Sequence, residues 1–118
     1  MAYVDAYVLP CPQDKVAAYR RLARKAGAVW KDHGALQYME CVADDVDPGK
    51  STSFPRAVKA KPGETVIVAF VVFRSRAARD RINARVMADP RLASLGPKDM
   101  PFDTRRMFWG GFKPIVEA

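Results

Sequence analysis

Two carboxylates stand out in this chain because apolar residues surround each of them in the sequence. Asp5 lies in the stretch "AYVDAYVL" and Glu40 in "ALQYMECVA". A carboxylate buried among such neighbours can act as a general base when burial raises its pKa. The alternative is an ion pair, because a buried charge requires a partner. The candidate cations for such a pair are Lys59, Arg105 and Arg106.

His33 is the only histidine, and helical spacing places it on the apolar side of its segment. We expect that side to face a cleft between helix and sheet, where His33 either contacts a ligand or is a structural imidazole stabilised by the helix dipole. Without HxxxH or HxxE spacing, a single histidine predicts no metal site. The candidate ligand-binding residues are Tyr3, Asp5, His33 and Glu40, and no catalytic residue is assigned.

Other motifs that carry chemistry are missing from the sequence. Cys11 and Cys41 have no Cys or His partner at metal-ligand spacing, so we expect two reduced thiols. Nucleotide-binding and P-loop motifs are also missing. We therefore expect no cofactor, and an enzymatic activity would have to be cofactor-independent.

The composition of the chain is that of a globular protein. It has 118 residues, of which 49% are apolar and 28% charged, and this length predicts one domain over 1–118. The N-terminal stretch "MAYVDAYVLPCP" does not resemble a signal peptide, and no apolar run has the length of a membrane span. We expect a cytoplasmic protein that does not bind membranes.

The charge balance raises the possibility of a polyanionic partner. Lys and Arg number 20 against 13 Asp and Glu, a formal net charge of +7. The two expected helices would carry a basic layer of Arg20, Arg21, Arg24, Lys25, Arg76, Arg79, Arg81 and Arg85. No aromatic residues interleave with these charges, and "VIVAFVVF" lacks the basic residue and one stacking ring of the RNA-recognition motif. A solvated face is the preferred interpretation, and nucleic acid is not excluded.

Hydrophobic periodicity predicts the first half of the fold. Residues 2–9 form a strand that ends at Pro10, and the 14–33 stretch is an amphipathic helix that ends near Gly34. Residues 35–43 resume strand character before a polar turn over 44–50. Residues 53–60 form a short edge strand in this interpretation.

The second half repeats the alternation of strand and helix. A strand over 65–73 precedes a helix over 76–88 that Ser75 caps and Asp89-Pro90 ends, and the final strand covers 105–116. The order strand, helix, strand, strand, helix, strand predicts an α+β, ferredoxin-like βαββαβ fold with an antiparallel sheet.

The strand "TVIVAFVVF" is apolar on both alternating faces, which is unusual for an antiparallel sheet with one face in water. The expected helices cover only one face. The other would be a costly exposed apolar surface unless a second sheet covers it. We therefore expect a homodimer packed sheet against sheet, with Phe70, Val72 and Trp109 as candidate interface residues.

Several stretches along the chain together resemble a known family. The segments that carry the likeness are "YVDAYV" at 3, "GAL" at 34, "EC" at 40, "DPGK" at 47, "AVKA" at 57, "DPR" at 89 and "MPFDTRRMFWGGF" at 100. They resemble the YbaA-like family of uncharacterised bacterial domains. The resemblance implies a ferredoxin-like domain of the dimeric α/β-barrel superfamily, and it implies no activity, cofactor or catalytic residue.

Three functions remain open at this stage. The first is a small homodimeric protein that binds an apolar or aromatic molecule between helices and sheet. The second is a protein that binds RNA or another polyanion through its basic helices. The third is a structural or stress-related dimer without a ligand.

Overall fold

Four antiparallel strands form the sheet of this protein. The computed structural model describes residues 1–118 and places the strands in the order β2-β3-β1-β4. Their bounds are Tyr3–Pro12 for β1, Gln37–Val42 for β2, Glu64–Phe73 for β3 and Phe108–Phe112 for β4. The two longest strands, β1 and β3, pair along their whole length at the centre of the sheet.

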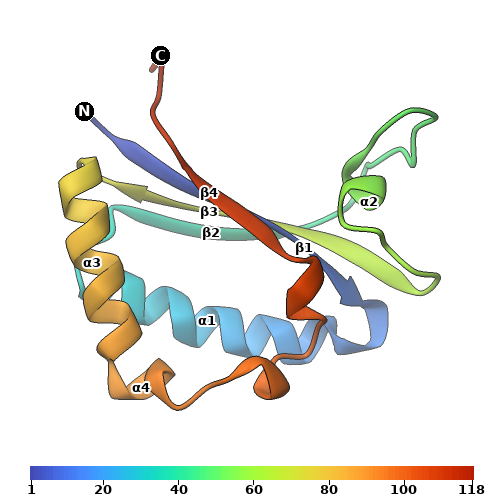
Figure 1. Cartoon of the computed structure of the whole chain (residues 1–118), viewed down its shortest axis with the longest axis horizontal. Helices are drawn as coiled ribbons and strands as arrows, with labels where there is room; N and C mark the ends of the chain where they lie inside the picture. Colours follow the sequence, from blue (N-terminus) through green and yellow to red (C-terminus); the bar gives the residue numbers. More distant parts are fainter.

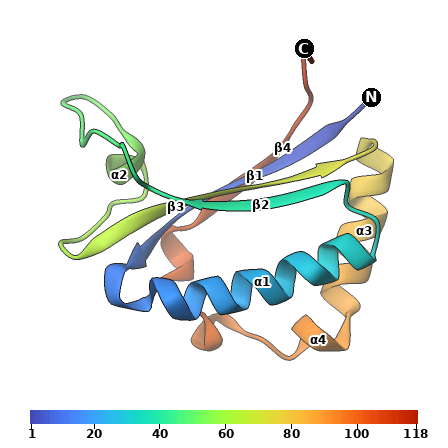
Figure 2. The same cartoon turned by 180° about the vertical axis from the view of Figure 1, so that it is seen from behind.

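Two long helices cover one face of this sheet. Helix α1 (Val16–Asp32) follows a short 3-10 turn, η1 (Gln13–Lys15), and helix α3 (Arg76–Ala88) joins β3 to the segment before β4. Figures 1 and 2 show both helices on the same side of the sheet. The element order and the strand order together confirm the predicted ferredoxin-like βαββαβ fold. None of the helices combines the length and the apolar character needed to cross a membrane.

The helix boundaries follow local sequence signals. The side-chain oxygen of Ser75 accepts a hydrogen bond from the backbone N–H of Ala78 at 3.1 Å, which caps α3 as predicted. At the end of α1, Gly34 adopts a φ of 114°, a left-handed conformation that glycine tolerates best. Both signals act within one turn of the helix end, so the sequence alone reveals them.

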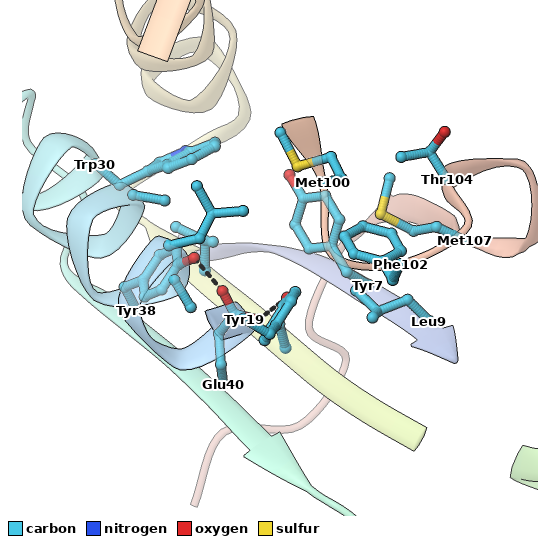
Figure 3. Close-up of a pocket in the computed structure, with 15 residues that line it drawn as sticks. Tyr7, Leu9, Tyr19, Trp30, Tyr38, Glu40, Met100, Phe102, Thr104 and Met107 are labelled. Atoms are coloured by element: carbon cyan, nitrogen blue, oxygen red, sulfur yellow. Dashed lines mark hydrogen bonds between the residues drawn. The ribbon is translucent and has the colours of Figure 1, made fainter. Parts of the chain in front are cut away.

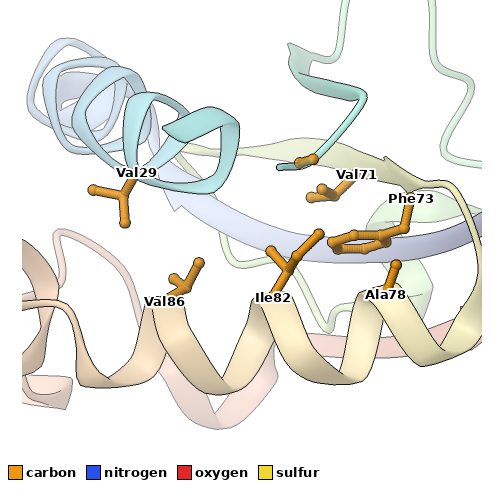
Figure 4. Packing of buried hydrophobic residues seen from close by; sticks show 7 residues of the cluster. Val29, Val71, Phe73, Ala78, Ile82 and Val86 are labelled. Atoms are coloured by element: carbon orange, nitrogen blue, oxygen red, sulfur yellow. The ribbon is translucent and has the colours of Figure 1, made fainter. Parts of the chain in front are cut away.

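One hydrophobic cluster joins α3 to the sheet and to the end of α1. Its members are Val29, Ala35, Val71, Phe73, Ala78, Ile82 and Val86. Ile82 projects from α3 toward the ring of Phe73 on β3, and Val29 faces Val86 across the two helices (Figure 4). A second cluster of Leu9, Cys11, Tyr19, Ala23 and Ile67 packs the start of α1 against the other end of the sheet.

The sheet face opposite the helices is apolar and largely uncovered. The register places Phe70 beside Ala6 and Val72 beside Val4 on this face. Trp109, by contrast, pairs with Tyr7 and stacks on its ring at 5.6 Å between centroids, which puts it on the helix side. Trp109 therefore lies on the opposite face of the sheet from Phe70 and Val72, the other two candidate interface residues. Successive residues of a strand such as β4 point to opposite faces of the sheet.

The segment predicted as an edge strand over 53–60 is a short helix instead. Helix α2 spans Phe54–Ala57, and the Ser53 side chain accepts a hydrogen bond from the backbone N–H of Arg56 at 3.2 Å. Pro55 stands in the first turn, where the missing N–H of proline costs nothing. Helix α2 lies on the opposite side of the sheet from α1 and α3 (Figure 1).

Two strand ends also differ from the prediction. Strand β1 runs through Pro10 and Pro12 because β4 pairs only with Val4–Val8, so one edge of β1 is free beyond that point and tolerates proline. The final strand is shorter than 105–116, since Thr104–Arg106 forms a 3-10 turn, η3. A one-turn helix, α4 (Pro90–Ala93), and a 3-10 turn, η2 (Pro97–Asp99), lie between α3 and this point.

Candidate functional site

A cavity of about 210 Å³ lies between the sheet, α1 and the segment that precedes β4. Fifteen residues line it, thirteen of them hydrophobic, and the two others are Glu40 and Thr104. Figure 3 shows the side chains of these residues converging from the sheet, from α1 and from the segment between α4 and β4. The lining residues are Tyr7, Leu9, Tyr19, Leu22, Ala23, Ala26, Trp30, Tyr38, Glu40, Ala69, Val71, Met100, Phe102, Thr104 and Met107.

Helical and strand periodicity explain how these residues converge. The α1 members recur at intervals of three or four residues, which places them on one face of the helix. The strand members occupy alternate positions of β1, β2 and β3, which all point toward the helices. Small side chains at Ala23, Ala26 and Ala69 leave open the space between the larger rings.

Glu40 is the only ionisable carboxyl group in the cavity wall. It projects from β2, and its two carboxylate oxygens accept hydrogen bonds from the hydroxyls of Tyr19 on α1 and Tyr38 on β2 (Figure 3). Burial, followed by the nearby Glu40 carboxylate, raises the pKa of Tyr19 and of Tyr38 above the ordinary range. Both tyrosines therefore stay protonated and donate to Glu40.

The cations expected beside Glu40 lie elsewhere. Arg106 forms ion pairs with Glu64 and Asp103, and Arg105 pairs with Asp103. No ion pair involves Glu40. The expectation of a cationic partner is therefore wrong for Glu40, and hydroxyl groups take that place.

Asp5 is fully buried and belongs to a separate polar network next to the cavity. Its Oδ2 accepts a hydrogen bond from the side chain of Asn83 at 3.0 Å, and its Oδ1 lies 3.5 Å from Nε of Arg79. The Oδ1 atom and the Arg79 Nε atom have no hydrogen-bond partner. Burial raises the pKa of the Asp5 carboxyl group, against the opposing effects of Asn83 and Arg79. Asp5 thus does form an ion pair, but with Arg79 instead of Lys59, Arg105 or Arg106.

Tyr3 and His33 lie outside the cavity wall. The Tyr3 hydroxyl accepts a hydrogen bond from Arg79 at 3.1 Å, and the Arg79 guanidinium lies 4.9 Å from the centroid of the Tyr3 ring. Nε2 of His33 lies 2.8 Å from Oδ2 of Asp89, at the junction of α3 and α4. Of the four candidate ligand-binding residues, Glu40 alone lines the cavity.

The cavity wall contains side chains that the sequence did not indicate as candidates. Tyr19 and Trp30 lie on the apolar face of α1, and their spacing could have shown that they share a wall. Met100, Phe102 and Met107 belong to an irregular segment, so no periodicity indicates that they close the cavity.

The remaining side chains that could take part in chemistry do not cluster into a site. Cys11 is buried and Cys41 exposed, and both are free thiols. No group of three or more His, Cys, Asp and Glu side chains is arranged to hold a metal ion.

Taken together, the fold and the cavity define a ferredoxin-like α+β protein with an aromatic-lined space between helices and sheet. Residues 2–104 match the family described as protein of unknown function DUF1428. The chain belongs to this family, as the resemblance to YbaA-like domains predicted. It is 44% identical to the uncharacterised protein YbaA of Escherichia coli K12 over 117 residues, which cover 99% of each chain. YbaA of Shigella flexneri matches to the same extent.

Solved structures share the fold at low sequence identity. A dimeric ferredoxin-like protein from an uncultured marine organism has a TM-score of 0.65 and 10% identity, with 99% of this chain and 98% of that chain covered. A nipsnap family protein of unknown function from Agrobacterium tumefaciens has a TM-score of 0.61 and 22% identity, with coverage of 96% and 87%. Rv0793 from Mycobacterium tuberculosis has a TM-score of 0.58 and 18% identity, with coverage of 100% and 99%.

Proposed function

We propose that this protein binds a small apolar or aromatic molecule in the cavity between α1 and the sheet, and that it does so as a homodimer. The observation that carries the first part is the lining: thirteen of fifteen residues are hydrophobic, and one carboxylate is available to orient a ligand. Small-molecule sites have this character, with a mostly apolar wall and few polar groups.

The size of the cavity supports a ligand of one or two rings. Packed protein interiors hold few voids larger than a water molecule, and the space of about 210 Å³ between α1 and the sheet is far larger than that. An apolar cavity of about 150 Å³ is enough to hold benzene. The aromatic side chains of Tyr7, Trp30 and Phe102 offer ring faces and edges against which such a ligand can pack.

Thermal denaturation with aromatic probes tests this proposal. Indole or naphthalene at about 100 times its dissociation constant should stabilise the protein by ~2.7 kcal/mol. The variant Ala26→Phe fills the cavity and should abolish the shift, whereas Ala17→Phe adds the same ring at an exposed position of the same helix and should retain it. If no aromatic probe of any charge binds the wild-type protein, the binding function is wrong.

The second part rests on the apolar sheet face opposite α1 and α3. Its most exposed large side chains are Met39, Phe108 and Phe112, with exposed fractions of 42%, 46% and 60%. Partly exposed side chains between them continue the surface: Val4, Val8, Val68, Phe70 and Val72. A continuous apolar surface of this kind favours an interface, and a second copy carries the complementary surface by symmetry. The structural relative from the marine organism is described as dimeric, which supports a dimer of this chain as well.

Sedimentation at micromolar concentration tests the dimer. We expect a species of twice the 13.1 kDa mass of the chain. Phe70→Glu and Met39→Glu, on the uncovered face, should shift it toward the monomer. Met87→Glu, on α3 and 64% exposed, should leave it unchanged. A wild-type protein that sediments only at 13.1 kDa contradicts the dimer and leaves the cavity proposal standing.

Exposed charge on the helices favours a second candidate, a polyanion ligand. Arg20, Arg24 and Arg85 remain exposed, whereas Arg79 turns inward to Asp5 and leaves the basic layer. Binding of generic RNA that weakens steeply between low and moderate salt would support this function. Absence of binding at low salt eliminates it.

A further inference from the structure

The Glu40 carboxylate lies in the apolar cavity wall without a countercharge. It forms no ion pair, although Glu40 also lines two surface grooves between α1 and the edge strand β2, and Arg20 lines both of them. Arg24 and Lys31 line one of these grooves, and the Lys31 ammonium donates to the Leu36 carbonyl instead. None of these neighbouring cations forms an ion pair with the Glu40 carboxylate.

The hydrogen bonds at Glu40 determine what kind of ligand group can meet it. Tyr19 and Tyr38 each donate to one carboxylate oxygen, so both hydroxyl protons are already used. A carboxylate accepts up to about four hydrogen bonds, which leaves further acceptor positions on Glu40. A ligand group that lies beside Glu40 must consequently be a donor, and an anionic group there would be repelled.

The aromatic wall adds a second preference for positive charge. Tyr7, Tyr19, Trp30, Tyr38 and Phe102 present ring surfaces around the same space. Ring faces carry negative potential, and they attract organic cations most strongly where water is excluded. A carboxylate among aromatic rings thus complements a protonated amine by both charge and surface.

We propose that the cavity takes a small organic amine in its protonated form. The hydrocarbon part of the amine packs against the apolar wall, and its ammonium group donates a hydrogen bond to Glu40. This inference rests on the proposed binding function and specifies its ligand class. An ammonium is preferred over a hydroxyl because both donate a hydrogen bond to the carboxylate, but only the ammonium adds an attraction between opposite charges.

Three probes of nearly equal size and shape test the ligand class on the wild-type protein. They are 2-phenylethylamine, which is protonated at neutral pH, 2-phenylethanol and phenylacetate. Isothermal titration should show that the amine binds about tenfold or more tighter than the alcohol, and that phenylacetate binds weakest. An alcohol that binds as well as the amine overturns the ligand class, while the binding function stands.

The variant Glu40→Gln tests the role assigned to the carboxylate. It should weaken amine binding by about tenfold or more and leave the alcohol within about threefold, because only the amine loses the attraction between opposite charges. Glu117→Gln removes the same charge at an exposed position near the C-terminus and should change neither affinity. Equal losses for amine and alcohol would contradict a specific ammonium contact. The probe series on the wild-type protein decides the ligand class even if Glu40→Gln folds poorly.

Discussion

Arg106 and Glu64 form a two-point ion pair, with Nη1–Oε1 and Nη2–Oε2 distances of 2.7 Å each. The Arg106 Nε atom also donates to Asp103 at 3.1 Å, and Nη1 donates to the Lys59 carbonyl oxygen at 3.0 Å. One guanidinium thus ties the segment before β4 to the first residue of β3. Because that segment carries Phe102 and Met107, the same contacts hold one side of the cavity in place.

Arg106→Lys tests this anchoring role. Lysine keeps the charge but cannot make the parallel pair of hydrogen bonds, because only the planar guanidinium presents that fork. We expect a melting temperature several degrees lower and weaker binding of indole. Arg105→Lys is the matched control, since the Arg105 side chain is 89% exposed and Asp103 is its only ion-pair partner. Similar losses in both variants would contradict an anchoring role specific to Arg106.

Three carboxylates in ion pairs predict a loss of stability in acid. Hydrogen bonds from Arg105 and Arg106 lower the pKa of Asp103 to about 2. Hydrogen bonds from Arg106 lower the pKa of Glu64, and bonds from Arg91, followed by His33, lower that of Asp89.

A group whose pKa is lower in the folded than in the unfolded state contributes stability above the unfolded value of about 4, and this contribution is lost as the pH falls through the folded value. The raised pKa of Asp5 acts in the opposite direction, but it is one group against three. The free energy of unfolding, measured with urea, should therefore decline between about pH 4.5 and pH 2. Glu64→Gln should have a lower free energy of unfolding at neutral pH, and this free energy should decline less steeply as the pH falls. The control Glu117→Gln should show the same free energy of unfolding as the wild type over the whole pH range. An identical slope for Glu64→Gln and wild type would show that this ion pair does not drive the loss.

The fold was predictable because its signals are local and repeated. The continuous apolar run of β3 and the 3.6-residue period of α1 each extend over many residues, and Ser75 caps α3 within a single turn. The errors fall where tertiary contacts decide the outcome. The prolines at the end of β1 are tolerated because β4 is too short to reach them.

The site was predictable only in part, because its members come from elements far apart in the sequence. Apolar neighbours predicted a buried Glu40, whereas the structure leaves this residue half-buried. Strand alternation places Tyr38 and Glu40 on the same face of β2, but the contact with Tyr19 depends on how α1 packs against the sheet. His33 follows the last residue of α1. Its partner Asp89 comes from the end of α3, and this pair lies outside the cavity. Helical spacing shows on which face of a helix a residue lies, but it does not show which residues of other elements it contacts.

Asn83 links Trp30 to Asp5 and provides a test of the buried network. The indole N–H of Trp30 donates to its oxygen at 3.0 Å, and its amide nitrogen donates to Asp5 at 3.0 Å. Asn83→Leu leaves both groups without this partner and should cost about 1–3 kcal/mol in the free energy of unfolding. Asn83→Asp should cost more at neutral pH, because it places a second carboxylate beside Asp5.

The cost of Asn83→Asp should depend on pH. Burial already raises the pKa of Asp5, and a neighbouring carboxylate raises it further. A raised pKa gives stability that is complete below the unfolded value of about 4 and is lost as the pH rises through the folded value. Urea denaturation should show a smaller deficit relative to wild type at pH 5 than at pH 8. Ala84→Asp, at the next and exposed position of α3, should show no such change. A deficit of Asn83→Asp that is independent of pH would contradict the coupling of the two carboxyls.

Gly27 tests the link between α1 and the Glu40 site. A Cβ atom at this position would lie 2.8 Å from Cδ1 of Tyr38, closer than packed atoms approach. Helix propensity alone predicts that Gly27→Ala stabilises α1 by about 1 kcal/mol. The clash should reverse the sign, because the Tyr38 ring packs against Trp30 at 5.8 Å and donates a hydrogen bond to Glu40, and a shift of the ring disturbs both contacts.

For Gly27→Ala we therefore expect a net loss of about 1–3 kcal/mol in the free energy of unfolding, the usual cost of overpacking a core, together with weaker binding of 2-phenylethylamine. Ala28→Gly, at the exposed neighbouring position, gives the propensity effect alone, a loss of about 1 kcal/mol with unchanged binding. A Gly27→Ala protein that is more stable than wild type and binds the amine normally would show that the Tyr38 ring can move away from position 27 without a loss of stability or of binding. In that case the tyrosine does not need this helix contact to hold Glu40 in place.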